Sequence, residues 1–432
     1  MGGRVHSKSD TEVLLKDNAL LLFEGMMAGI CGGLAIVVYR YLLTWAEGGL
    51  FYILNIIKGN VLYTVLWFAA LIIMACMTAL LVRWEKMAGG SGLPQVSGEA
   101  QGHFDACWYR VIAAKIIAAS IAIFGGLSLG RGGPSIQIGA MAGKGYSRAF
   151  HHDKKMEKEF LSCGAGAGLA ATFNAPAAGI LFVVEEIRHG VDKTLLTAGI
   201  AAAASAAFVS RLFFGQGSIF SYQSASLPLT YYWLLVLLGV ILGLAGAGFN
   251  FVMLKSQALF AYFKKVPKEI LYSVVFVISG ILALNVQDVL AGGRVMTNLL
   301  EQGHPALMML VGLLIVKFLF TMLCVGAGIP GGIFFPLLVL GSYLGAIYGD
   351  IVINFLHLDA GMWQQFIILG MAGLFAGIIR TPVTSVILIA EMTGCTGSLL
   401  DIAVVSVFAY MTANLTGSKP ICRSLLENML KG

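Results

Sequence analysis

Long charge-poor runs dominate this chain, and they restrict it to folds that place most of its segments in lipid. No Lys, Arg, Asp or Glu occurs between Leu212 and Leu254. Of the 432 residues, 58% are hydrophobic and only 12% are charged. Because about 20 apolar residues span the hydrocarbon core as a helix, many such runs indicate a polytopic membrane protein. The predicted fold is all-α, and the chain is expected to be a multi-pass integral protein of a lipid bilayer.

Several runs are too short for a full crossing or are interrupted by glycine and proline. The clearest interruption is Leu-Gly-Arg-Gly-Gly-Pro-Ser at residues 129–135. Glycine lets another group approach the backbone closely, and proline at the first turn of a helix loses no hydrogen bond. The motif predicts an apolar segment that stops at membrane depth, followed by a helix that starts near Gly133. Taken alone, the motif equally fits a glycine-rich helix–helix turn. The chain as a whole favours tilted, broken and re-entrant helices over a simple bundle.

The spacing of lysine, proline, glycine and glutamate repeats along the chain. A lysine precedes a proline by 19 residues, glycines follow at plus five and plus nine, and a later proline precedes a glutamate by nine. The same pattern occurs twice, with offsets of 202 to 206 residues. The matched positions are Lys115, Pro134, Gly139, Gly143, Pro176 and Glu185 in the first half, and Lys317, Pro336, Gly341, Gly345, Pro382 and Glu391 in the second. Chance does not supply so many matches, and the chain is interpreted as an internal repeat.

The repeat predicts five segments. They are an N-terminal segment 1–18, a first membrane repeat 19–215, a linker 216–229, a second membrane repeat 230–418 and a short C-terminal segment 419–432. Duplicated halves with broken helices are typical of transport folds, whose site lies at the repeat interface near mid-membrane. If the halves are inverted, helix N-termini from both halves point at that site.

Loop charge predicts the orientation. Residues 148–158 and 255–268 each carry four lysines or arginines, so the positive-inside rule makes both loops cytoplasmic and the linker external. Both termini are expected to be cytoplasmic, and the polar residues 1–18 predict no cleavable signal peptide.

The net charge of +6 comes from loops without an extended basic patch, which argues against nucleic acid as a partner. The seven cysteines show no paired spacing, so neither a disulfide, a metal nor another cofactor is expected.

Three glycine–proline motifs carry the candidate chemistry, at residues 89–94, 130–134 and 328–336. They supply backbone N–H groups, and Ser91 adds a hydroxyl, but none supplies a carboxylate, so the site suits an anion. A bare ion in a low-dielectric interior costs tens of kcal/mol in the Born limit. One helix terminus returns at most about 2 kcal/mol, and one charge-assisted hydrogen bond about 1.5–3 kcal/mol. Several converging motifs are therefore required.

These motifs resemble those of the chloride-transporting CLC family. The similar stretches are Gly-Ser-Gly-Leu-Pro at 90–94, Gly-Arg-Gly-Gly-Pro at 130–134, Gly-Ile-Phe-Phe-Pro at 332–336, Asn-Ala-Pro at 174–176 and Gly-Ser-Lys-Pro at 417–420. They follow the family's order over nearly the whole chain. The resemblance implies a homodimer with inverted repeats and one chloride pathway in each subunit. The cytoplasmic regulatory domains of some relatives are not expected here.

The resemblance also implies roles for individual residues. The Ser91 hydroxyl, with Gly90 beside it, and the N–H groups of Ile333 and Phe334 would bind the central anion, and serine at 91 is similar to chloride-selective members. A helix cap is the alternative for Ser91. The outer anion site would be formed by the backbone of Gly130, Arg131, Gly132 and Gly133.

Four charged residues are expected near the predicted pathway, and three of them have two possible roles. Glu186 matches the family's internal proton-transfer glutamate, and its alternative is an ion-pair partner for Arg188. Glu185 is expected to be structural, because it matches Glu391 in the other half. The lysines Lys115 and Lys317 would either add positive potential along the pathway or snorkel to the surface.

Two residues depart from the family pattern. Gly132 stands where relatives have a glutamate that gates the outer site and carries protons. Cys422 stands where relatives have a tyrosine that binds the central anion and narrows the inner mouth, and a thiol is a poor donor. The missing carboxylate predicts uncoupled, channel-like chloride transport. The alternative is a proton/chloride antiporter scaffold altered at both gates.

An intramembrane serine protease is the rival from another class, because residues 89–92 also fit a Gly-x-Ser-Gly pattern with Ser91 as nucleophile. That chemistry requires a general base within hydrogen-bond reach. All seven histidines fall in loops or at segment edges, and the repeat has no purpose in a protease. The protein is therefore predicted not to be an enzyme.

The glycine- and alanine-rich runs near 198–208 and 382–413 are expected to pack between the subunits of the homodimer.

Overall fold

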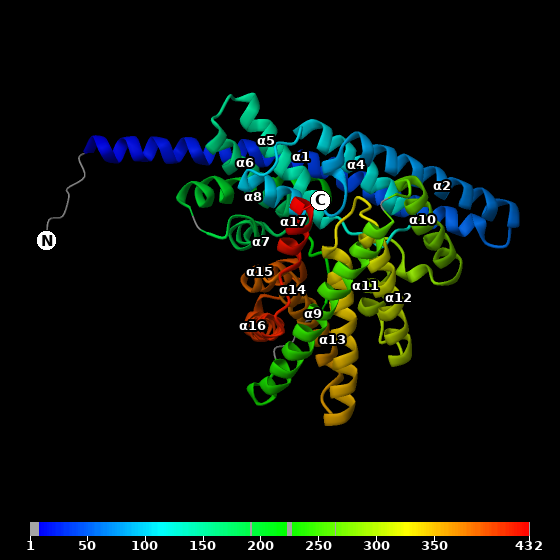
Figure 1. Cartoon of the computed structure of the whole chain (residues 1–432). Coiled ribbons are helices and arrows are strands. Elements are labelled where there is room, and N and C mark those ends of the chain that lie inside the picture. Colours follow the sequence, from blue (N-terminus) through cyan, green and yellow to red (C-terminus); the bar gives the residue numbers. More distant parts are fainter. Residues whose placement is uncertain (1–7, 191, 223–226, 264, 432) are drawn as a thin grey trace.

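The computed structural model describes residues 8–190, 192–222, 227–263 and 265–431, and these residues form helices and connecting loops with no β-strand (Figure 1). Residues 1–7 of the predicted N-terminal segment lie outside this description. The first half contains α1 (Lys8–Ile57), α2 (Val61–Trp84), α3 (Leu93–Gln101), α4 (Trp108–Phe124), α5 (Gly132–Ala149), α6 (Lys154–Phe173), α7 (Pro176–Phe182), the π-helical turn η2 (Val183–Arg188) and α8 (Lys193–Phe214). The second half contains α9 (Tyr232–Tyr262), α10 (Lys268–Asn285), α11 (Arg294–Gln302), α12 (Leu307–Gly326), α13 (Phe334–Leu356), α14 (Trp363–Ile379), α15 (Pro382–Thr393), α16 (Leu399–Leu415) and α17 (Ile421–Lys431).

Within these ranges, nine helices are long and apolar enough to cross a membrane. Others are short, such as α3 with nine residues and α7 with seven. The expectation of an all-α membrane fold with broken helices and inverted repeats is confirmed.

The repeated glycines lie where two helices touch. A Cβ on Gly139 or Gly143 of α5 would collide with backbone carbonyls of α6. In the second half, a Cβ on Gly341 or Gly345 of α13 would collide with backbone carbonyls of α14. The equal spacing from the preceding proline therefore reflects the same close helix pair built twice.

Each of the two repeated glutamates accepts hydrogen bonds from a helix N-terminus of the other half. Glu391, at the end of α15, accepts hydrogen bonds from the N–H groups of Ala177 and Ala178 at the start of α7 (3.2 and 2.9 Å). Glu185 accepts from the N–H groups of Val383 and Thr384 at the start of α15 (3.2 and 2.7 Å). Each carboxylate satisfies free donors at the other half's helix N-terminus. The expectation that Glu185 is structural is confirmed.

The repeated lysines hold loops. Lys115 and Lys317 are fully buried, so the snorkelling alternative is wrong. The ammonium of Lys115 donates to the carbonyls of Ala88 and Gly90 (2.9 and 2.8 Å). The ammonium of Lys317 donates to those of Val289 and Ala291 (both 2.8 Å). The two loops held in this way precede α3 and α11.

The small residues of α8 have a different role from the one expected. Gly25 and Gly29 of α1 lie directly against the backbone of Ala198 and Ala202, so this face of α8 is covered within the subunit. Likewise, Gly243 of α9 lies against α16. Because close helix packing needs small side chains inside a subunit as well as between subunits, composition alone did not distinguish the two.

Candidate anion site

Backbone hydrogen bonds join the three glycine–proline loops. Gly130 and Gly332 exchange N–H···O bonds of 2.6 and 2.7 Å, which forms an antiparallel bridge between the halves. Gly90 donates to the carbonyl of Gly328 (3.0 Å) and accepts from the N–H of Gly331 (3.1 Å). The loops that sequence analysis selected separately are therefore one structural unit.

Three helices begin at this unit. They are α3, whose cap Gly92 has a left-handed φ of 95°, α5 and α13. A Cβ on Gly133 would lie 2.5 Å from the carbonyl oxygen of Ser91, so only glycine permits this approach. The first N–H groups of each helix have no partner within the helix. The structure thus brings donors of all three predicted motifs, including those of Ile333 and Phe334, to one place.

The walls of the site beside Gly132 are aromatic. A Cβ on Gly132 would lie 2.9 Å from ring atoms of both Phe173 and Phe334. The Phe334 ring also makes edge contacts with Phe182 and Phe375, at centroid distances of 5.6 and 5.4 Å. Backbone dipoles with apolar walls can hold an anion weakly enough for it to leave again, as conduction requires.

Ser91 faces a cavity of about 610 Å³, here called the serine cavity, whose lining includes Gly90, Tyr272, Lys86 and Lys268. The N-cap of α3 is Gly92 rather than Ser91, and no side chain makes a cap hydrogen bond to this helix. The helix-cap alternative is therefore wrong. Among the described residues that line the serine cavity there is no histidine, so this cavity offers Ser91 no imidazole as the general base that a serine protease requires.

Glu186 is a buried carboxyl with a different neighbour from its predicted alternative. Arg188 forms an ion pair with Glu159, so it is not the partner of Glu186. Glu186 instead lies beside Cys422 of α17, whose thiol interacts with its carboxyl group. Only 6% of Glu186 and 3% of Cys422 are exposed.

Cys422 lies in the first turn of α17. Leu425 and Met429, on the same face of that helix, line the serine cavity. Cys422 itself does not line the cavity and lies one turn closer to the start of the helix. Its predicted place at the inner mouth stays a prediction.

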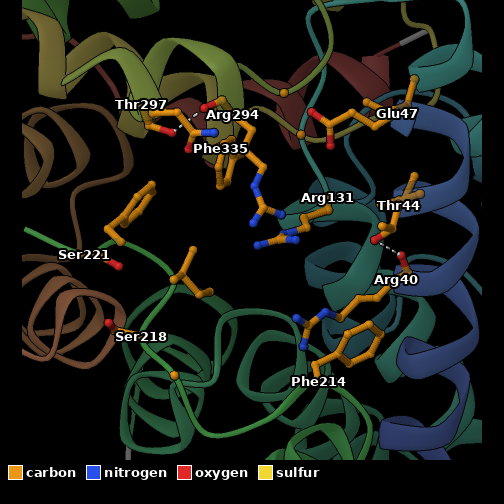
Figure 2. Close-up of a pocket in the computed structure, with 18 of the residues that line it drawn as sticks. Arg40, Thr44, Glu47, Arg131, Phe214, Ser218, Ser221, Arg294, Thr297 and Phe335 are labelled. Carbon is orange, nitrogen blue, oxygen red and sulfur yellow. Dashed lines mark hydrogen bonds between the residues drawn. The ribbon is translucent and has the colours of Figure 1, made fainter. Parts of the chain in front are cut away.

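A second cavity, of about 320 Å³, was not predicted from the sequence. It is here called the arginine cavity, because Arg40, Arg131 and Arg294 line it together with Gly130 and Gly292 (Figure 2). Of the arginines, only Arg131 belonged to a recognised motif.

One match in the sequence could have predicted the loop before α11, which contributes Gly292 to the arginine cavity. Ala-Gly-Gly at 291–293 follows Gly-Ser-Gly at 90–92 by 201 residues, close to the offset of the other matches. The caps Gly92 and Gly293 have similar φ values, 95° and 101°, and each precedes a helix of nine residues. The arginine cavity is thus the second half's counterpart of the serine cavity.

Two inverted halves that bring helix N-termini to a shared site inside the membrane define an anion transport protein. The family model described as voltage gated chloride channel matches residues 70–414, and the chain belongs to this family, the CLC family. Its members are transporters and channels rather than enzymes.

Relatives with similar sequences and solved structures with a similar fold agree with this assignment to the CLC family. The chain is 35% identical over 382 residues to the H(+)/Cl(-) exchange transporter ClcA of Vibrio parahaemolyticus, covering 85% of this chain and 81% of the relative. It is 32% identical over 427 residues to ClcA of Yersinia pseudotuberculosis, covering 96% and 89%. A slow cyanobacterial Cl-/H+ antiporter superposes with a TM-score of 0.88 at 26% identity, covering 95% of this chain and 98% of the antiporter. A eukaryotic CLC transporter, at a TM-score of 0.78 and 21% identity, shares the fold, covering 94% of this chain and 73% of the transporter.

Proposed function

We propose that this protein moves chloride across the membrane without coupling it to protons. One observation is the main support for chloride transport without proton coupling. The position at which the family resemblance implies a gating glutamate is Gly132, and the atoms nearest to a Cβ built there belong to the rings of Phe173 and Phe334. A site without a carboxylate there has no side chain that competes with the anion or delivers a proton to it.

The proposed path uses the residues named from the sequence. The outer site is the backbone at residues 130–133, and the central site is formed by Ser91, with the N–H groups of Ile333 and Phe334. The place of Ser91 in the lining of the serine cavity supports this assignment, because a hydroxyl that faces a cavity and does not cap α3 can donate to an anion or a water there.

A proton/chloride antiporter is the second candidate, and two observations favour it. The ClcA relatives bear the name of H(+)/Cl(-) exchangers. In this chain Glu186 remains a buried carboxyl without an ion-pair partner in the described residues. Glu47 lines the arginine cavity with Arg131, so it is a carboxylate that could replace the missing gate as outer proton acceptor.

The deciding experiment is simultaneous measurement of chloride and proton flux from vesicles that contain the purified protein. We expect chloride efflux driven by its gradient with no opposite proton movement. Proton uptake against its own gradient would contradict the uncoupled reading and support the antiporter.

Two variants then identify the proton carriers. Loss of proton movement in Glu186→Gln would assign the inner step, and loss in Glu47→Gln would assign the outer one. The matched control is Glu427→Gln at the exposed end of α17.

A further inference from the structure

The arginine cavity collects three cations from three distant parts of the chain. Arg40 comes from the middle of α1, Arg131 from the loop before α5 and Arg294 from the first turn of α11. Figure 2 shows the three guanidinium groups pointing into the same space. Their charges act on one another, which is unfavourable for three cations held around one cavity.

No carboxylate of the described residues forms an ion pair with any of the three arginines. In the described parts of the chain, the side chain of Arg131 makes neither a hydrogen bond nor an ion pair, and it lies 5.4 and 6.0 Å from the ring centres of Phe335 and Phe173. Arg40 donates to the carbonyl of Ala171 (3.0 Å) and the hydroxyl of Ser210 (2.6 Å), which are both uncharged.

Two carboxylates line the cavity without cancelling its charge. Glu301 accepts a hydrogen bond from the N–H of Ser221 (3.1 Å). Glu47 makes no ion pair within 4.0 Å in the part of the chain that is described, and its charge acts on Arg131 and Arg294 across the cavity. Three arginines against two glutamates leave one positive charge in excess. The cavity therefore favours an anionic occupant.

The size and lining select the kind of anion. A volume of about 320 Å³ is roughly ten times the share of one water molecule in the liquid, which is more room than a halide uses. The rest of the lining combines apolar side chains and glycines with four hydroxyl residues, Thr44, Ser218, Ser221 and Thr297. Guanidinium groups present planar pairs of donors that match the spacing of two oxygens on one anion.

We propose that the arginine cavity binds a small hydrophilic oxyanion of the class of sulfate and hydrogen phosphate, and that the bound oxyanion slows chloride movement. Gly130 and Arg131 belong both to the lining and to the proposed outer chloride site, so an occupant lies over that site. The effect on flux rests on the proposed function, whereas binding of the oxyanion does not.

Binding is tested first, by calorimetric titration of sulfate into the detergent-solubilised full-length protein in a low-chloride buffer. We expect saturable binding that weakens about tenfold in Arg294→Gln, because one charge-assisted partner is lost. Glu47→Gln should strengthen binding, because it removes a negative charge from the lining. The opposite signs separate a site in this cavity from a general loss of fold.

Two controls locate the site. Lys58→Gln removes a cation in the turn between α1 and α2, outside the cavity lining, and should change sulfate affinity less than twofold. Ser91→Ala alters the central chloride site and should also leave sulfate affinity unchanged. Absence of saturable sulfate binding, or an Arg294→Gln protein that binds as tightly as the unaltered one, would overturn the proposal.

Flux is tested next, with sulfate or hydrogen phosphate added to one side of the vesicles at a time. We expect either anion to slow chloride efflux from one side only, with the half-inhibiting concentration following the binding constants of the variants. Sulfate that binds but leaves efflux unchanged would overturn the inhibitory role alone. A protein that binds sulfate but never moves chloride would instead refute the proposed function.

Discussion

At the scale of single residues, Ser91 combines a buried position with a place in the lining of the serine cavity. Replacing it with alanine removes a donor to the ion and no contact that holds the fold. We expect Ser91→Ala to be expressed and folded normally, with weaker chloride binding and a lower preference for chloride over nitrate. Flux with each anion as the sole permeant species measures this. Unchanged affinity and unchanged preference would contradict the ligand role.

Gly132 has a sharper consequence, because a carboxylate there would compete with chloride when ionised. We expect Gly132→Glu to lower chloride flux at neutral pH and to restore it as the pH falls and the carboxyl becomes protonated. Desolvation raises the pKa of such a group, whereas N–H donors lower it. Flux against pH in vesicles measures this response.

The control for this variant is Gly132→Ala. Any Cβ at this position would lie 2.9 Å from the rings of Phe173 and Phe334, so both variants force the rings to move. Only the glutamate variant should become pH-dependent. If Glu186 and a water path to it remain intact, Gly132→Glu should also introduce proton movement opposite to chloride. Equal acid activation in the alanine variant would show that the carboxylate is not responsible.

At the scale of helices, the crossed caps of Glu185 and Glu391 join α7 to α15. An N-terminal cap contributes about 0.5–2 kcal/mol. We expect Glu185→Gln and Glu391→Gln each to lower the thermal unfolding midpoint in detergent, because the amide keeps the shape and loses the charge. Glu427→Gln, whose ion-pair partners are exposed, is the control and should have little effect. A midpoint that falls for one capping glutamate but not the other would contradict their equivalence.

The loop between α3 and α4 is tied to α5 by Asp105. Its hydrogen bond to the Lys144 ammonium, helped by Arg148, holds the pKa of the Asp105 carboxyl below its ordinary range. A lowered pKa stabilises the fold above the unfolded value of about 3.9 and loses this contribution as the pH falls below it. We expect Asp105→Asn to flatten the loss of stability between about pH 5 and 3.

Thermal unfolding at a series of pH values measures this effect. Because the Asp105 side chain is 61% exposed, added salt should weaken the effect. Asp359→Asn, which keeps a cap acceptor but lies in no ion pair in the described residues, is the control. An acid profile of Asp105→Asn identical to that of the unaltered protein would remove Asp105 from this role.

At the scale of the whole molecule, we expect two copies to associate. The small-residue face of α8 is used inside the subunit, but its opposite face exposes Ile200 and Phe208. Mass measurement in detergent should give a dimer. Ile200→Trp should shift it toward monomers, whereas Val274→Trp, on the exposed face of α10, should not. A protein that is monomeric without substitution would contradict this expectation.

The internal repeat and the three glycine–proline loops could be predicted from the sequence. Proline, glycine and buried charged residues are each required by the local geometry, so they recur at fixed spacings. The arginine cavity could not be predicted from the sequence. Arg40, Arg131 and Arg294 are separated by 91 and 163 residues, and no periodicity links them. The sequence also did not show that Glu186 faces Cys422, since that contact depends on how α17 packs. Contacts between distant segments are set by the fold and leave no local pattern.

The bridge between Gly130 and Gly332 has a consequence for how the protein is made. The two glycines are 202 residues apart, so a ribosome that adds about 5–20 residues per second supplies the second roughly 10–40 s after the first. During that interval the loop before α5 and the N-terminus of α7 lack the backbone and the carboxylate that complete them. A chain stalled at its midpoint is therefore an open structure with unsatisfied donors in the bilayer, and it is a natural target for membrane quality control.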